Sequence, residues 1–417
     1  MEYIQGNPND KKNKGNIMRK EEAKWQKVVL IAVMLLFSVS ATVVSAYLYG
    51  KAFRNIFTIL VIATACFGSA VFSLIQSDIA GTLHYDNSEH YIRFVLIFLI
   101  GIAAGCLLPL LPDTGWIFPA LALALTLFSN TVTGMVAYAG ILGVCVLLSD
   151  TGVLVYVLYF LLGMIFSVLF EQLDEEYKTG KLIGITVILY VTSITAMVVF
   201  QTRGRLEIEQ FLIPVMNIFV TVLLILAVLR FYCATVVDSE KAKYLRINDQ
   251  EFELLAKYKE EDEKLYYNAI HTAYFVEKSA RLLNMDVDAA KNGGYYHRII
   301  VAECKKQGIS LEELCRKKKF PPKAVRLLQE YNYKSEAIQM RETAVVYIVD
   351  AVVSSLLYLI EKNPDSDIDY GTIASAIIKR KIDSGIFNKS SLTIRDIVEM
   401  EKIFTGEKLY YDFLRRE

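Results

Sequence analysis

The first half of this 417-residue chain has very few ionisable residues. The whole chain lacks a paired-cysteine motif. Between Val28 and Arg230 charged side chains are sparse, whereas the segment after Asp238 is dense in Lys, Arg, Asp and Glu. The formal net charge of zero therefore conceals two different domains. None of the six cysteines has CxxC spacing, so we expect reduced thiols and neither a disulfide framework nor a zinc ribbon.

The charge-poor half is also strongly apolar. Hydrophobic residues make up 54% of the chain, which favours a helical membrane protein over an ordinary soluble one. After a basic tail over residues 1–27, a transmembrane module is predicted over residues 28–233. Its eight predicted spans are Val28–Tyr49, Ile56–Ile75, Phe94–Leu111, Trp116–Phe128, Val132–Leu148, Gly152–Phe170, Leu182–Phe200 and Phe211–Phe231. A span needs about 20 residues, so Trp116–Phe128 would be a short, tilted or re-entrant element.

No ionisable residue lies near the middle of any predicted span. Intramembrane charges usually mark ion or proton pathways, so their lack argues against a pump or a coupled transporter. A carrier of neutral solutes with a regulatory domain stays open on this ground. The longest connection, residues 76–93, contains His84, Asp86, Glu89 and His90. We expect a solvated loop there, with a metal or proton role as the alternative.

The orientation in the membrane follows from the basic residues and from parity. An excess of Lys and Arg marks the cytoplasmic side, so residues 1–27 are predicted to be cytoplasmic. Eight spans return the chain to that side, in agreement with Arg230 and Lys241 near the last span. Lys51 and Arg203, on the predicted outer side, make the charge bias moderate.

The charged half is predicted to be helical. Residues 234–264 show helical spacing and would be a linker, either a coupling segment or a solvated helix. Residues 265–417 would form an all-α globular domain, because few alternating β patterns occur and the length suffices for one core. The predicted helices are Tyr266–Leu283, Val287–Arg298, Ser310–Lys318, Pro322–Tyr331 and Arg341–Glu361. A basic run, Lys317–Lys319, would be a solvated face or would touch anionic lipid headgroups.

Three segments contain the residues with candidate chemistry. GGYYHRI places His297 beside Arg298, FPPKAVRLLQEYNY ends in Tyr331, Asn332 and a further Tyr, and ETAVVYIVDAVVSSL places Asp350 within an apolar run. An unpaired carboxylate is costly in such surroundings. We therefore expect Asp350 to have a partner, either a metal ion or the guanidinium of Arg298.

Together with ELLAKYKEEDEKLYYNAIHTAYFVEKSA, these segments resemble the bacterial multi-span membrane HD-domain family, the seven-transmembrane HD proteins, from about Leu254 to Leu414. Active members of that family hydrolyse cyclic di-AMP. The resemblance implies a helical domain in which imidazoles and carboxylates hold one or two divalent ions, Mn, Fe or Mg, that activate water. It also implies a bacterial cytoplasmic membrane. The large extracellular sensor domain that follows the family's first span is missing from this sequence.

Most of the metal ligands implied by the resemblance are replaced. The family's first His falls on Asn268, with His271 one helical turn further on the same side. Arg298 stands where the family has the Asp of its His-Asp pair, and a cation there would repel a metal ion. The later His-His pair falls on Tyr331 and Asn332. The implied ligands that remain are His297 and Asp350.

We therefore expect a membrane-anchored pseudoenzyme with no catalytic residue and no cofactor, acting in nucleotide signalling, in regulation or as a scaffold. Its partners would be the lipid bilayer and either a cyclic dinucleotide or a protein, and not nucleic acid; a homo-oligomer stays open. The alternative is a metal-dependent phosphohydrolase acting on cyclic di-AMP or a related nucleotide, with a site rebuilt around Asn268, His271 and Cys304. Ligand number separates the two, because a two-metal site needs more than two protein ligands.

Both termini are predicted to be cytoplasmic. Reporter fusions at residue 10 and at the C-terminus should therefore report the same side of the membrane, the cytoplasmic one. Labelling on opposite sides would remove one span, and Trp116–Phe128 would be the first to be reassigned.

Overall fold

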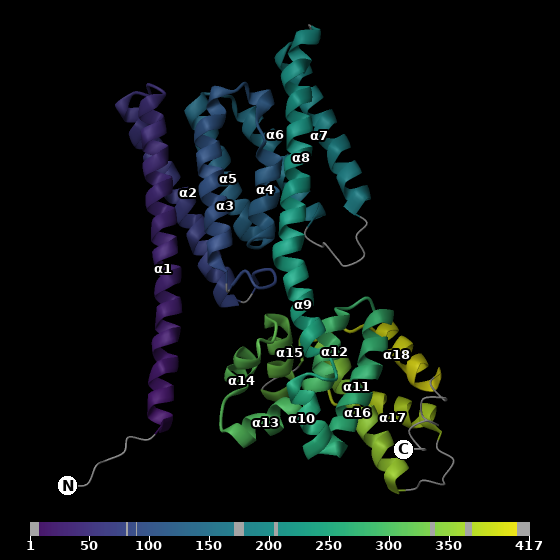
Figure 1. The fold of residues 1–417 in the computed structure, drawn as a ribbon. Helices are drawn as coiled ribbons and strands as arrows, with labels where there is room; N and C mark the ends of the chain where they lie inside the picture. Colours follow the sequence, from purple (N-terminus) through teal and green to yellow (C-terminus); the bar gives the residue numbers. More distant parts are fainter. Residues whose placement is uncertain are drawn as a thin grey trace, which may run out of the picture. The chain divides into compact units, whose positions relative to one another are not determined.

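The computed structural model describes residues 8–80, 82–88, 90–170, 179–203, 207–333, 338–362 and 369–406, with the side chains of the first helix from Trp25 onward. Over these ranges the chain is helical and has no β-strand, which confirms the all-α prediction (Figure 1). Two compact units are present, Met1–Val236 and Val237–Glu417.

Each predicted span lies on a helix of the first unit. These helices are α1 (Pro8–Leu48), α2 (Phe53–Ala80), α3 (Tyr91–Leu107), α4 (Phe118–Leu127), α5 (Thr131–Ser149), α6 (Val153–Leu169), α7 (Thr179–Gln201) and α8 (Leu212–Tyr232). Short 3₁₀ turns lie at Leu108–Leu110, Asp113–Gly115 and Ile208–Phe211, and a π-helical turn at Cys233–Val237.

Seven helices of the described chain are long and apolar enough to cross a membrane. Six of them begin in the first unit, and the seventh is α16 of the second unit (Arg341–Lys362). The helices α4 and α6 are shorter. The protein is therefore a multi-pass membrane protein, and the number of crossings stays a prediction.

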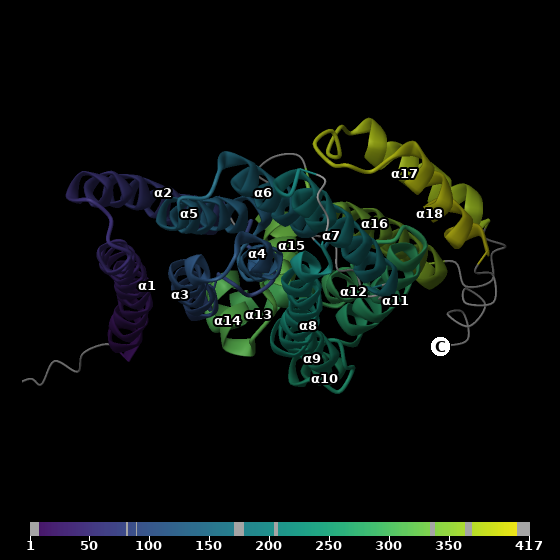
Figure 2. The same ribbon diagram turned by 90° about the horizontal axis from the view of Figure 1, so that it is seen from above.

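The short helix α4 is the core of the first unit. Figure 2 shows it among α3, α5, α6 and α8, against all of which it packs. Nine of its 10 residues are buried, and only Leu121 is partly exposed. At a rise of 1.5 Å per residue it is about 15 Å long, half the thickness of the hydrocarbon layer. The expectation of a short element around residues 116–128 therefore agrees with the helix observed.

The connection between α3 and α4 contains two short 3₁₀ turns but no α-helix, so some of its carbonyl groups need partners from side chains. Within a membrane such backbone is tolerated only where protein groups satisfy it. Asn217 Nδ2 donates to the carbonyl oxygens of Thr114 at 2.7 Å and Trp116 at 3.2 Å. The hydroxyl of Tyr159 donates to the carbonyl oxygen of Asp113 at 2.7 Å. Neighbouring helices thus fix the connection in place.

The loop before α3 differs from the solvated loop that we expected. The side chains of Asp86 and Asn87 are buried, with 1% and 3% of their surface exposed. Arg93 Nη1 donates to Asp86 Oδ1 at 2.7 Å, and Asn87 Nδ2 donates to the carbonyl oxygen of Leu127 at 3.1 Å. The expectation of a solvated loop is wrong for these two residues, because they are bonded to the helices around them. Glu89 lies outside the described residues.

The second unit is a bundle of shorter helices. They are α9 (Asp238–Ile247), α10 (Glu253–Glu261), α11 (Glu263–Leu282), α12 (Val287–Tyr296), α13 (Ile299–Gln307), α14 (Leu311–Lys318), α15 (Pro322–Tyr333), α16 (Arg341–Lys362), α17 (Tyr370–Asp383) and α18 (Ile394–Gly406). Two buried clusters hold them together, one around α9 to α15 and one around α11, α16, α17 and α18.

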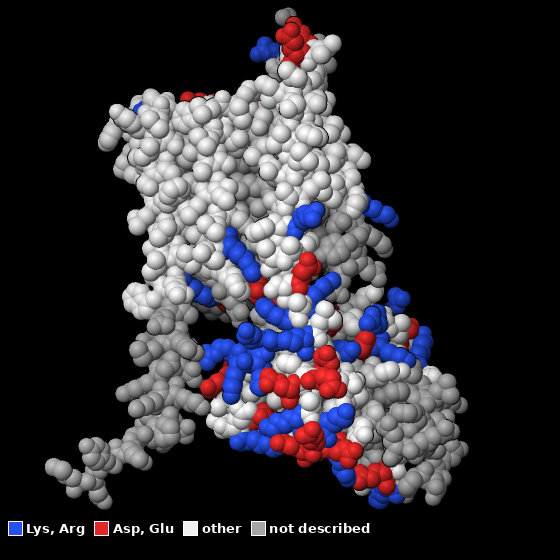
Figure 3. All heavy atoms as spheres, viewed as in Figure 1, with Lys and Arg blue, Asp and Glu red and all other residues white. Residues whose placement is uncertain are grey.

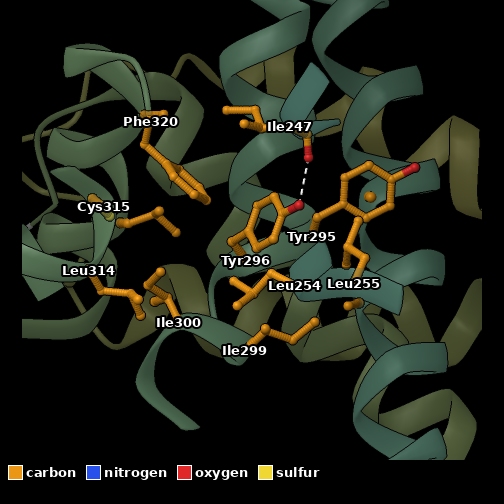
Figure 4. Packing of buried hydrophobic residues seen from close by; sticks show 14 of the residues in the cluster. Ile247, Leu254, Leu255, Tyr295, Tyr296, Ile299, Ile300, Leu314, Cys315 and Phe320 are labelled. Atoms are coloured by element: carbon orange, nitrogen blue, oxygen red, sulfur yellow. Dashed lines mark hydrogen bonds between the residues drawn. The ribbon is translucent and has the colours of Figure 1, made fainter. Parts of the chain in front are cut away.

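The helices α9 and α10, within the segment predicted to be a linker over residues 234–264, contribute side chains to the buried cluster of this bundle. Figure 4 shows Ile247, Leu254 and Leu255 packed around Tyr296, whose hydroxyl donates to the carbonyl oxygen of Ile247. The apolar side of α10 is buried against α11 and α12 rather than solvated, and the boundary between the two units falls after Val236.

Close packing of α4 on α5 generates a testable prediction. A Cβ atom on Gly134 would lie 2.4 Å from the Cα atom of Thr126, whereas one on Gly143 would meet nothing closer than 3.8 Å. Forcing α4 and α5 apart should cost about 1–3 kcal/mol. We expect Gly134→Ala to lower the thermal midpoint of the detergent-solubilised protein, and the matched Gly143→Ala to leave it equal or higher. Equal losses in both variants would contradict this packing.

Candidate functional site

Five of the predicted site residues meet at one place in the second unit. Asn268 comes from α11, His297 and Arg298 from the junction of α12 and α13, Tyr331 from α15 and Asp350 from α16. The predicted helix over Val287–Arg298 ends at Tyr296, two residues early. The α11 and α12 helices approach closely because Gly294 lacks a side chain, since a Cβ atom there would lie 2.6 Å from the Cα atom of Ala273.

Asp350 is the centre of the site, and 6% of its surface is exposed. Its Oδ1 atom lies 2.7 Å from Arg298 Nη2 and 3.1 Å from His297 Nε2. The hydroxyl of Tyr331 donates to Oδ2 at 2.6 Å, and the hydroxyl of Ser354 donates to Oδ1 at 3.0 Å. Four side chains therefore surround one carboxylate, and two of them are basic.

Ser354 joins the centre to its outer partners. Its Oγ atom accepts from Arg298 Nη2 at 2.8 Å and from Asn268 Nδ2 at 2.9 Å, while its hydrogen is donated to Asp350. A hydroxyl has one hydrogen and two lone pairs, so its capacity is complete. The sequence analysis missed Ser354, although its place four residues after Asp350 on one helical face was a usable signal.

His297 is held from two sides. Its ring has no exposed surface, and Nδ1 lies 2.8 Å from the carbonyl oxygen of Gly294 in the preceding turn. The ring packs edge-on against Tyr331, with the centroids 5.1 Å apart. These contacts fix the direction of Nε2 towards Asp350.

The electrostatics keep the site ionised. Burial alone would raise the pKa of Asp350, but contacts with His297, Arg298 and Tyr331 outweigh it and hold that pKa well below its ordinary value. Burial and the negative charge of Asp350 both raise the pKa of Tyr331, so the phenol keeps its proton and donates it. Burial would lower the pKa of Arg298, but the charge of Asp350 raises it overall. The site is thus a hydrogen-bonded ion pair.

Two predicted positions take other contacts. His271, one turn along α11 from Asn268, stacks on the ring of Tyr267 at a centroid distance of 6.0 Å. Asn332 donates through Nδ2 to the carbonyl oxygen of Leu328 in its own helix, at 2.8 Å. Neither contact points to a metal ligand.

The donor set does not fit a one- or two-metal hydrolytic centre. Only His297 and Asp350 supply ligand atoms beside each other, and the guanidinium of Arg298 already lies against the carboxylate. No group of three or more His, Cys, Asp or Glu side chains suited to a metal ion occurs in the described part of the chain. Divalent centres of this kind need more ligands, and a neighbouring cation opposes their charge.

Comparison of this chain with family models, with curated proteins and with solved structures finds no match.

Burial of His271 generates a pH prediction. Burial lowers its pKa from 6.5 to about 4, so protons bind the unfolded chain more tightly. The free energy of unfolding of residues 237–417 should be highest above pH 6.5 and should fall by roughly 3 kcal/mol towards pH 4. The depressed pKa of Asp350 acts only below this window, because its stabilisation is lost beneath the ordinary value of 3.8. Urea unfolding at several pH values should show a smaller slope in His271→Gln; an unchanged slope would contradict the assignment.

Proposed function

We propose that this protein is a membrane-anchored regulatory or scaffold protein whose second unit is a non-catalytic, HD-like domain. The observation that carries the proposal is the ion pair between Arg298 and Asp350 at 2.7 Å. The resemblance to the HD-domain family implies a divalent ion beside this carboxylate, and the guanidinium of Arg298 supports the proposal because it is a cation that lies there instead.

The chemistry of this pair opposes hydrolysis of a phosphodiester. Activation of water in such sites depends on metal ions, which lower the pKa of a bound water and neutralise the phosphate. A guanidinium is positively charged at every physiological pH and donates hydrogen bonds, but it binds no water as a ligand. Arg298 therefore supplies the charge that balances Asp350 without supplying a nucleophile.

The same network has a structural role. It links α11, α15 and α16 with the junction of α12 and α13 through side chains alone. The carboxylate of Asp350 is buried, whereas the side chain of Arg298 is 42% exposed, so solvent screens the pair on one side. The hydrogen bonds among these side chains hold the helices of the bundle together without a metal ion. We propose a cyclic dinucleotide or a protein as the partner of this domain.

The alternative is a metal-dependent phosphohydrolase acting on cyclic di-AMP or a related nucleotide. One distance favours it, because Nε2 of His297 lies 3.1 Å from Oδ1 of Asp350, close enough for both atoms to bind one ion. The ion would be Mn, Fe or Mg, and Arg298 would have to move away.

We further propose that the first unit crosses a bacterial cytoplasmic membrane eight times, with both termini in the cytoplasm. Side-chain contacts support alternating helix directions. The hydroxyl of Tyr49, after α1, donates to the carbonyl oxygen of Cys106 near the end of α3. Ser77 near the end of α2 contacts Thr133 near the start of α5 at 3.1 Å.

A gain-of-metal experiment tests the proposed function. We expect the purified full-length protein, supplied with Mn, Fe or Mg, to bind no stoichiometric metal and to leave cyclic di-AMP intact. The double variant Asn268→His with Arg298→Asp places an imidazole and a carboxylate beside His297 and Asp350, and should bind one divalent ion.

Arg298→Met is the matched control, since it removes the cation without adding a ligand and should bind no metal. Stoichiometric metal in the unmodified protein, with cyclic di-AMP hydrolysis that is lost in His297→Ala, would establish the hydrolase instead. Absence of metal from the double variant would show that these four positions do not converge as described.

A further inference from the structure

A group of basic side chains lies at the ends of α9 and α14 in the second unit. Arg316, Lys317 and Lys318 lie in the last turn of α14, Lys319 is the residue that caps its C-terminal end, and Arg246 lies in the last turn of α9. Figure 3 shows Lys and Arg side chains gathered where α9 and α14 lie in Figure 1. We call the exposed members the basic edge, and they are Arg246, Arg316, Lys317 and Lys319.

A hydrogen bond fixes the two helix ends beside each other. Nη2 of Arg246 donates to the carbonyl oxygen of Lys318 at 3.1 Å. Lys318 is itself neutralised, because its Nζ lies 2.8 Å from a carboxylate oxygen of Glu253. Within the described residues, Arg316, Lys317 and Lys319 form no ion pair with a carboxylate. The basic edge therefore presents an uncompensated positive charge.

Helix electrostatics explain only part of this arrangement. Basic residues in a last turn stabilise a helix by about 0.3–1 kcal/mol through its dipole. Lys319, however, has the left-handed backbone conformation (φ +60°), in which glycine is favoured. A lysine there gives up backbone stability while adding one more positive charge to the surface.

Chain connectivity ties α9, which contains Arg246, directly to the last apolar helix of the first unit. Helix α8, which is apolar, continues through the π-helical turn Cys233–Val237 directly into α9. The π-helical turn of five residues and the 10 residues of α9 together span about 22 Å along the helix axis, which sets the greatest distance between Arg246 and the end of α8. Leu245, beside Arg246 on α9, is 73% exposed, which suits a lipid interface better than water.

We propose that the basic edge binds the anionic phospholipid headgroups of the membrane that the first unit crosses. Each Lys or Arg near an anionic lipid surface contributes about 1 kcal/mol. Four such residues would hold the end of α14 on the lipid surface. The exposure of this helix end to solvent would then depend on the charge of the lipids and on the salt concentration. This inference is independent of the chemistry at Asp350.

Hydrogen–deuterium exchange of the full-length protein in nanodiscs tests the proposal. We compare nanodiscs of phosphatidylcholine alone with nanodiscs that also contain phosphatidylglycerol. Amides at residues 316–320 should exchange about fivefold more slowly with the anionic lipid, the factor that corresponds to about 1 kcal/mol. Raising the salt to about 1 M, where the screening length is about 3 Å, should remove the difference.

Charge reversal supplies the control. Lys317→Glu with Lys319→Glu should abolish the difference. The matched pair Lys379→Glu with Arg380→Glu changes the charge equally at the end of α17, also at exposed positions, and should keep it. Unchanged hydrogen–deuterium exchange across α16 verifies the fold of each variant. If Lys317→Glu with Lys319→Glu unfolds the domain, Lys317→Gln with Lys319→Gln takes its place.

Three results would overturn the proposal. One is equal exchange in the two lipid compositions. Another is that Lys379→Glu with Arg380→Glu removes the difference in exchange between the two lipid compositions as fully as Lys317→Glu with Lys319→Glu does. The third is equal protection of these amides in phosphatidylcholine nanodiscs by an added soluble ligand. Protection by glycerol phosphate would assign the basic edge to a free phosphate ligand, and protection by RNA would assign it to a nucleic acid.

Discussion

The carboxylate of Asp350 is buried in the middle of α16, a helix long and apolar enough to cross a membrane. The arrangement of the helices around it depends on the partners that this carboxylate needs. A buried charge without a partner costs several kcal/mol. Arg298 and His297 supply positive or polar nitrogen atoms, while Tyr331 and Ser354 supply hydroxyl groups. Because Tyr331 lies on α15 and the His297–Arg298 pair at the junction of α12 and α13, satisfying the carboxylate on α16 also fixes the positions of those helices.

The first unit meets a comparable constraint in the connection between α3 and α4, which is made of short 3₁₀ turns. Side chains from α6 and α8 donate hydrogen bonds to carbonyl groups of this connection, Tyr159 and Asn217 among them. The short α4 can then occupy the core, where Gly134 allows it to touch α5. In both units, then, the buried polar groups determine which helices lie next to each other.

The sequence predicted the class of fold better than it predicted local contacts. Apolar runs located the helices because burial of their side chains requires that pattern. Asn268 and Arg298 were placed at one site by resemblance, and the structure brings both to Ser354. Burial of Asp86 and the packing of α10 could not be foreseen, since each depends on neighbours distant in sequence. The implied metal chemistry and the family itself stay predictions.

The central claim is that Arg298 acts as the charge partner of Asp350. A double-mutant cycle on residues 237–417, with Arg298→Met, Asp350→Asn and the pair of changes, measures this most directly by urea unfolding. We predict that the free energies of unfolding are non-additive, with a coupling of about 1–3 kcal/mol in favour of the pair. Additivity to within about 0.5 kcal/mol would contradict the account, because Asp350 would then be stabilised by something other than the guanidinium.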